Sequence, residues 1–199
     1  MCYFMKTRIN ILTGLFLTVF LTSCNDFGDR QNPLYGIIYR LEKEVTQFKN
    51  YKDIGGSVID NTKDEAGNYK FGISHLTNNV RHILTFEQFI REPNNPQPRY
   101  QILDSINIDN IKEIEYITYC ICRQDSIYDP QIIALVIADE EQEYYDKIVR
   151  AWRADTETGE IVLIKNTKGI NCINEGYGLD ACGEEEHLDQ PTDTTNIDN

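Results

Sequence analysis

Two kinds of hydrophobic pattern follow one another along the chain. In the first, over residues 32–50, apolar side chains recur every three or four positions: Leu34, Ile37, Ile38, Leu41, Val45 and Phe48. This spacing is typical of an amphipathic α-helix. Asn32 and Pro33 supply an N-cap oxygen and a proline suited to the first helical position. The segment is therefore expected to form a helix that ends near Asn50 and packs its apolar face on a sheet.

The second pattern, in the C-terminal half, consists of short runs rich in β-branched and aromatic residues with turn sequences between them. The runs cover residues 113–123, 131–138, 144–155 and 160–165. Such residues fit a pleated surface, and the second run is apolar after Gln131, which predicts a strand buried on both faces. A loop that ends in Gly159 predicts a hairpin between the last two runs. Successive strands joined in this way form an antiparallel meander.

A long N-terminal helix followed by a meander resembles the order of elements in cystatin-like folds, where a curled antiparallel sheet wraps a helix. The fold class that this resemblance implies is α+β, with the N-terminal amphipathic helix packed on a curled antiparallel β meander. Residues 32–182 are expected to form a single domain, because a chain of this length can bury one core. Residues 183–199 are acidic and carry few apolar side chains, which predicts a disordered tail.

An uncharged apolar stretch near the N-terminus predicts export. It starts at Ile9, after the positive charges of Lys6 and Arg8, and it ends near Phe20. A membrane-spanning helix needs about 20 apolar residues, so this stretch is short for a span. A charged start followed by a short apolar centre is typical of a secretory signal peptide, here residues 1–23.

The stretch is followed by Leu21-Thr22-Ser23-Cys24, which resembles the lipobox of bacterial lipoproteins. This resemblance implies cleavage before Cys24, a thioether-linked diacylglyceryl group on its sulfur and acylation of the new amino terminus. More than one acyl chain gives stable membrane anchoring, and residues 24–31 then form a lipidated tether. The alternative is an ordinary cleaved signal peptide whose Cys24 enters a disulfide.

The residue after the anchor bears on localisation. Asn25 stands where many lipoproteins of the inner membrane have aspartate, so by analogy the outer membrane is expected, on its periplasmic side or at the cell surface. Residues 151–155 and 169–176 are also similar to the C-terminal part of small lipoproteins of gut anaerobes. That similarity implies no particular activity.

The net charge of the chain limits the classes of molecule that it is expected to bind. The formal net charge is −13, and removal of Lys6 and Arg8 with the signal peptide makes it −15. Such a chain repels phosphate backbones, so nucleic acid is not an expected partner. The expected partners are the membrane, through lipid on Cys24, and proteins of the cell envelope.

Four cysteines remain beside the anchor: Cys120, Cys122, Cys172 and Cys182. An even number in an exported chain predicts disulfides. Cys172 and Cys182 flank a short Gly-rich loop, and their pairing is the favoured one. Cys120 and Cys122, two apart on one expected strand, would then be buried thiols facing the same way, unless one of them is recruited into the bond. A zinc site of four cysteines fits poorly, because Cys-Ile-Cys lacks the usual spacing.

The rest of the sequence contains no established motif for a catalytic, metal or cofactor site. His75 and His82 lie on either side of an expected turn and could face one another, but no third ligand stands at motif spacing. No nucleophile elbow, zinc-protease helix or phosphate loop is present, and neither a cofactor nor a metal is expected. Aromatic residues of the strands could form a binding face, with Tyr144, Trp152 and Tyr116 as its main candidates and Tyr145 and Tyr119 beside them. The competing interpretation is that these residues belong to the core.

The sequence therefore predicts a lipid-anchored binding or assembly module of the cell envelope without catalytic activity and with an unidentified ligand. One alternative is an envelope hydrolase whose carboxylates converge only in the fold. Another is a proteinase inhibitor, suggested by the cystatin-like order, although the Gln-x-Val-x-Gly hairpin of cystatins is missing.

Overall fold

The structure, a computed structural model, describes residues 32–178. These residues form three antiparallel β-sheets and two short 3-10 turns. The expectation of an α+β fold is wrong, because the described residues contain no α-helix.

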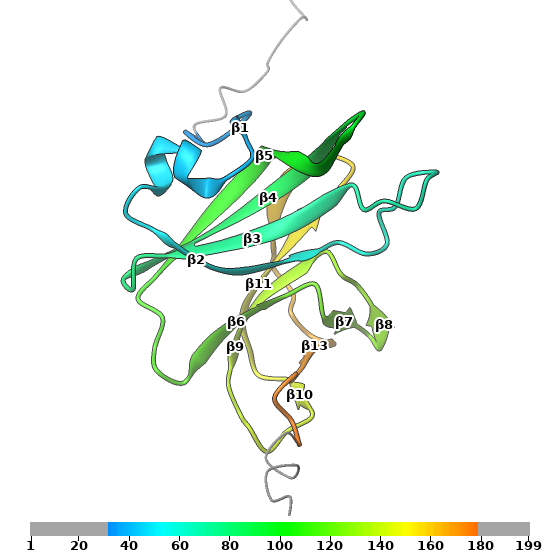
Figure 1. The fold of residues 1–199 in the computed structure, drawn as a ribbon. Helices are drawn as coiled ribbons and strands as arrows, with labels where there is room; N and C mark the ends of the chain where they lie inside the picture. Colours follow the sequence, from blue (N-terminus) through cyan, green and yellow to red (C-terminus); the bar gives the residue numbers. More distant parts are fainter. Residues whose placement is uncertain (1–31, 179–199) are drawn as a thin grey trace, which may run out of the picture. The chain divides into compact units, whose positions relative to one another are not determined.

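The first sheet, here called the five-stranded sheet, is built from the N-terminal half. Its spatial order is β1 (Ile38–Tyr39), β5 (Asn95–Asp109), β4 (Arg81–Glu92), β3 (Phe71–Thr77) and β2 (Lys52–Val58). Figure 1 shows β2 to β5 lying side by side, with residues 42–48 next to β1. Those residues form the 3-10 turns η1 (Glu42–Glu44) and η2 (Thr46–Phe48).

The C-terminal half forms two smaller sheets. The central sheet has the order β12 (Glu160–Ile164), β11 (Ile148–Asp155), β9 (Ile132–Ile137) and β6 (Glu115–Tyr119). This is the predicted meander, because neighbours in the sheet follow one another among these four strands. The outer sheet has the order β10 (Tyr144–Tyr145), β13 (Ile170–Ile173), β7 (Cys122–Gln124) and β8 (Ile127–Tyr128).

The predicted N-terminal helix is absent, and tertiary pairing explains why. Gly36 adopts a φ of 77°, which glycine tolerates and which interrupts a helix. The Gly36 amide donates to the carbonyl of Ile102, and the Ile102 amide donates to the carbonyl of Ile37. Residues 36–39 thereby join the edge of the five-stranded sheet. The expected apolar face is split as well, since Ile38 and Leu41 are 47% and 44% exposed whereas Val45 and Phe48 are buried.

Three apolar clusters hold these layers together. One lies on the face of the five-stranded sheet that is covered by residues 34–48. The second packs the other face of that sheet on the central sheet, with Phe86 and Trp152 among its members. The third packs the central sheet on the outer sheet. Side chains of β9 alternate between the last two clusters, which confirms the prediction of a strand buried on both faces.

The predicted hairpin after β11 is confirmed. Asp155 pairs with Glu160 at the end of the strands, and the Gly159 amide donates to the Asp155 carbonyl over 2.8 Å. Gly159 has a φ of 73°, a left-handed conformation that costs glycine little. The Asp155 carboxylate also accepts the amides of Glu157 and Thr158. The turn is therefore encoded locally.

The disulfide joins Cys122 to Cys172, which have Cα atoms 3.9 Å apart and a sequence separation of 50. The favoured pairing of Cys172 with Cys182 is therefore wrong. The structure instead has the alternative pairing, in which one cysteine of the 120–122 pair is recruited. Cys182 lies outside the described residues. The two cysteines face each other across β7 and β13.

Cys120 and Cys122 do not face the same way, contrary to expectation. Cys120 belongs to the cluster between the five-stranded and central sheets. Cys122 belongs to the cluster between the central and outer sheets. The reason is a φ of 64° at Cys120, which ends the strand where the chain crosses between sheets. Burial raises the pKa of the free Cys120 thiol to about 12, so it stays protonated at neutral pH.

Candidate functional site

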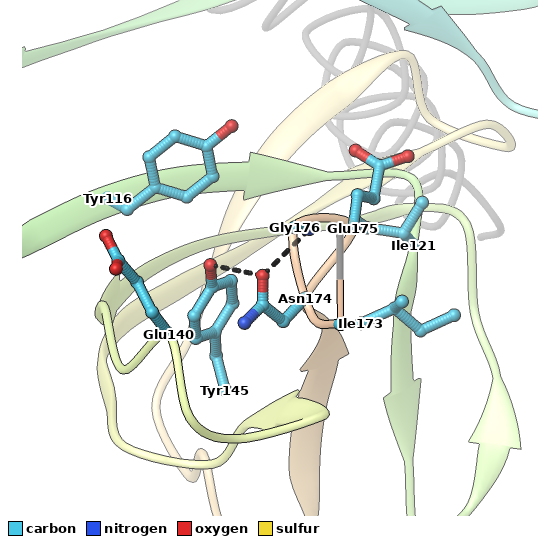
Figure 2. Close-up of a pocket in the computed structure, with 9 residues that line it drawn as sticks. Tyr116, Ile121, Glu140, Tyr145, Ile173, Asn174, Glu175 and Gly176 are labelled. Carbon is cyan, nitrogen blue, oxygen red and sulfur yellow. Dashed lines mark hydrogen bonds between the residues drawn. The ribbon is translucent and has the colours of Figure 1, made fainter. Parts of the chain in front are cut away.

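The candidate site is a pocket of about 440 Å³ beside the outer sheet, here called the tyrosine pocket. It is lined by Tyr116, Ile121, Glu140, Tyr145, Ile173, Asn174, Glu175, Gly176 and Gly178. Tyr116 comes from β6, Tyr145 from β10, and residues 174–178 follow β13. Three segments distant in sequence therefore supply its walls (Figure 2).

Asn174 fixes the shape of this pocket. Its side chain is buried, and its amide nitrogen donates to the carbonyls of Gln142 over 2.9 Å and Asp139 over 3.4 Å. Its amide oxygen accepts the Tyr145 hydroxyl over 2.8 Å and the Gly176 amide over 3.0 Å, the two bonds drawn in Figure 2. The Asn174 side chain thus holds together, by hydrogen bonds, the loop before β10, the Tyr145 ring and the turn after β13.

The rings of Tyr116 and Tyr145 lie next to each other at an angle in this pocket. The ring centroids of Tyr116 and Tyr145 are 6.2 Å apart, and the ring planes are inclined by 49°. Tyr116 is 53% exposed, so much of its ring is available to a ligand. Tyr145 is half-buried, and its hydroxyl is already bonded to Asn174.

The charge of the lining is negative. Glu140 and Glu175 are exposed at the pocket, and no lysine or arginine is among its lining residues. The pKa of Tyr145 is raised by burial, and then by the charges of Tyr116, Glu140 and Glu175. Tyr145 therefore remains a neutral phenol, and both carboxylates act on the same ring.

The structure separates the three residues of the expected aromatic face. Tyr116 lines the pocket. Trp152 is only 7% exposed and packs in the core between the five-stranded and central sheets. Tyr144 does not line the pocket; its ring lies 4.9 Å from the guanidinium of Arg123. Cys24, the expected lipidation site, lies outside the described residues.

Sequence reasoning did not select Asn174, Glu140 and Glu175 as site residues. Glu140 stands in an acidic turn that is typical of a solvated loop. Asn174 and Glu175 follow a short strand, where a polar turn is ordinary. Only the pairing of β10 with β13 brings these segments together, so no local signal marks them.

His75 and His82 do face each other, as expected. Nε2 of His75 and Nδ1 of His82 are 2.9 Å apart, and the Tyr119 ring meets the His75 ring edge to face. Burial first, and then the nearby His82, lower the pKa of His75 to about 4. Among residues 32–178, no group of three His, Cys, Asp or Glu side chains is placed to hold a metal ion.

The part of the chain described by the structure is thus an all-β domain of three antiparallel sheets that carries an acidic, aromatic pocket. No protein-family model matches the chain, and neither curated proteins nor solved structures provide a match. Within the described residues, no helix has the length and apolar character needed to cross a membrane.

Proposed function

We propose that this protein is a lipid-anchored binding module of the bacterial cell envelope, and that its tyrosine pocket receives a basic side chain of a partner protein. One observation carries the proposal. Two tyrosine rings and two carboxylates line one pocket, and no basic side chain of that lining neutralises them.

The chemistry of this lining favours an ammonium or guanidinium group. A cation on an aromatic face gains about 0.5–1 kcal/mol at an exposed site, and an exposed carboxylate contributes about 0.2–1 kcal/mol. Tyr116 presents such a ring, with Glu140 and Glu175 across the same pocket. The sum of these terms predicts weak binding of one basic side chain, with added affinity where a partner has several.

The charge of the whole chain supports the same class of partner. The formal charge is −13 for the full sequence and −15 without Lys6 and Arg8, so the protein attracts a basic segment over a distance, which raises the rate of association. This attraction is screened by salt over about 10 Å. A basic segment of another envelope protein fits both the long-range charge and the lining of the pocket.

Removal of the lipid-bearing sulfur tests the anchor. Cys24→Ser is expected to move the protein from the membrane fraction to the soluble fraction, because the acyl chains would be absent. Cys182→Ser, which leaves the lipobox intact, is the matched control and is expected to stay with the membrane. A Cys24→Ser protein that remains fully membrane-bound would show that the lipobox interpretation is wrong.

A peptide titration tests the pocket. Trilysine added to the full chain in detergent is expected to shift the NMR signals of Gly176 and Gly178 in a saturable, salt-sensitive way. Tyr116→Ala is expected to weaken this binding about fivefold, the equivalent of roughly 1 kcal/mol, and Glu140→Gln is expected to weaken it by a smaller factor. The proposal fails for this pocket if both variants bind trilysine as the wild type does.

Tyr69→Ala provides the matched control for the loss of a tyrosine. Tyr69 stacks with Lys63 in a hairpin that contributes nothing to the tyrosine pocket. Its replacement is expected to leave trilysine binding unchanged, and triglutamate is expected not to bind at all. A similar response to triglutamate would mean that charge does not select the ligand.

A further inference from the structure

A second pocket lies on the face of the five-stranded sheet that also packs against residues 34–48. It has a volume of about 520 Å³ and shares no lining residue with the tyrosine pocket. Its aromatic members are Tyr39, Phe89 and Tyr100, from β1, β4 and β5. Glu42 and Asp53 add carboxylates, and no lysine or arginine is among the lining residues. We call it the glycine-floored pocket.

Three glycines expose backbone on the floor of this pocket, which β2 and β3 form. Gly55, Gly56 and Gly72 all line this pocket. A Cβ atom on Gly72 would lie 2.6 Å from Cζ of Phe89, so only glycine lets that ring pack against β3. The rings of Phe89 and Tyr100 meet at 90° with centroids 5.4 Å apart, and Tyr39 lies 5.6 Å from Tyr100. The result is an aromatic wall beside a floor in which three glycines leave backbone exposed to the pocket.

A buried carboxylate lies directly behind this wall. Glu87 is 1% exposed, and its oxygens accept the hydroxyls of Tyr39 over 2.5 Å, Thr85 over 2.6 Å and Ser74 over 2.9 Å. Tyr39 and Ser74 themselves line the pocket, so the charge is one hydroxyl away from it. Among the described residues, none of the hydrogen-bond or ion-pair partners of Glu87 is cationic.

A buried carboxylate without a counter-charge is costly, and such groups are usually paired. Burial accordingly raises the pKa of Glu87, although the three hydroxyl donors act in the opposite direction. The neighbouring groups do not supply the missing charge. Glu42 repels Glu87, and Arg91, which acts on Tyr100 from β4, is exposed and does not line the pocket.

We propose that the glycine-floored pocket is a second binding site, which takes a small organic cation with an ammonium group. The ring faces attract the cation, Glu42 and Asp53 hold it at the rim, and its charge balances that of Glu87 through Tyr39 and Ser74. Binding and ionisation of Glu87 are then linked, so each favours the other by the same factor. The site requires neither the tyrosine pocket nor a protein partner.

The test uses tetramethylammonium and the full chain carrying Tyr116→Ala and Glu140→Gln, so that the tyrosine pocket is impaired. Saturable NMR shifts at Gly56 and Gly72 are expected, together with higher thermal stability as ligand is added. Glu87→Gln preserves the shape of the side chain and removes its charge, and is expected to weaken binding about tenfold. Tyr100→Leu, which keeps an apolar side chain without a ring face, is expected to weaken binding as well.

Each outcome separates this proposal from that for the tyrosine pocket. Binding that survives in the impaired background and is lost with Glu87→Gln supports the second site. Absence of saturable binding in that background overturns it and leaves the trilysine result unaffected. If Glu87→Gln folds poorly, Glu42→Gln at the exposed rim provides the charge test; unchanged binding in both Glu42→Gln and Tyr100→Leu also overturns the proposal.

Discussion

Replacement of both Cys122 and Cys172 by alanine is expected to lower the free energy of unfolding by about 4 kcal/mol. The bond closes a loop of 50 residues, and the loss of chain entropy in the unfolded state from a loop of this length is worth roughly that amount. Both cysteines are fully buried between the central and outer sheets. Urea unfolding followed by the fluorescence of Trp152, the one tryptophan of the chain, measures the effect.

Cys120→Ala is the matched control. It removes a buried sulfur from another cluster and leaves the disulfide intact, so a loss of only about 1 kcal/mol is expected. Peptide mapping without reduction is expected to recover Cys122 joined to Cys172. A peptide that joins Cys172 to Cys182 would contradict the pairing, as would a double variant as stable as the control.

The free energy of unfolding is expected to fall by about 2 kcal/mol through His75 alone when the pH is lowered from 7 to 5. The pKa of His75 is depressed from 6.5 to about 4 in the folded protein, chiefly by burial. Between these values the unfolded chain binds more protons than the folded one, so stability decreases as the pH falls. Protonation of both rings would leave Nε2 of His75 and Nδ1 of His82 as two donors and would break the hydrogen bond between them.

Comparison with His75→Leu isolates this effect. The variant is expected to lose about 2 kcal/mol less than the wild type between pH 7 and pH 5. Glu87 acts in the opposite direction, because its raised pKa makes stability fall as the pH rises, but it contributes equally to both proteins and cancels. His82→Leu, which removes the more exposed ring, is expected to change the pH dependence less. Equal losses in His75→Leu and wild type would contradict the assignment.

Local signals were sufficient for several elements. The continuous apolar run around β9 predicted a strand covered on both faces, because no polar side chain in it could face water. The hairpin at 155–159 was predicted because its turn depends on a glycine and on an aspartate that binds nearby amides. The facing of His75 and His82 was predicted from a short turn between neighbouring strands. In each case the residues that decide the structure lie close together in sequence.

The N-terminal segment shows where such signals mislead. Its apolar spacing was that of a helix, but residues 36–39 gain backbone hydrogen bonds to β5, more than 60 residues away. Helical periodicity describes only contacts within the segment, and a helix of this length gains most of its stability from packing. In this protein the segment packs on the edge and one face of a sheet. Gly36 and the two 3-10 turns give the backbone the shape that this packing needs.

The sequence by itself determined the acidic charge and the four-strand meander, and it predicted export and a lipid anchor, since each depends on composition or on neighbouring residues. Only the tertiary structure decided the disulfide pairing, the burial of Trp152 and both pockets. Cys122 and Cys172 lie on paired strands of the outer sheet, and Tyr116, Tyr145 and Asn174 come from segments that are distant in sequence. The physical reason is that strand pairing between distant segments depends on how every layer packs, and no local pattern encodes it.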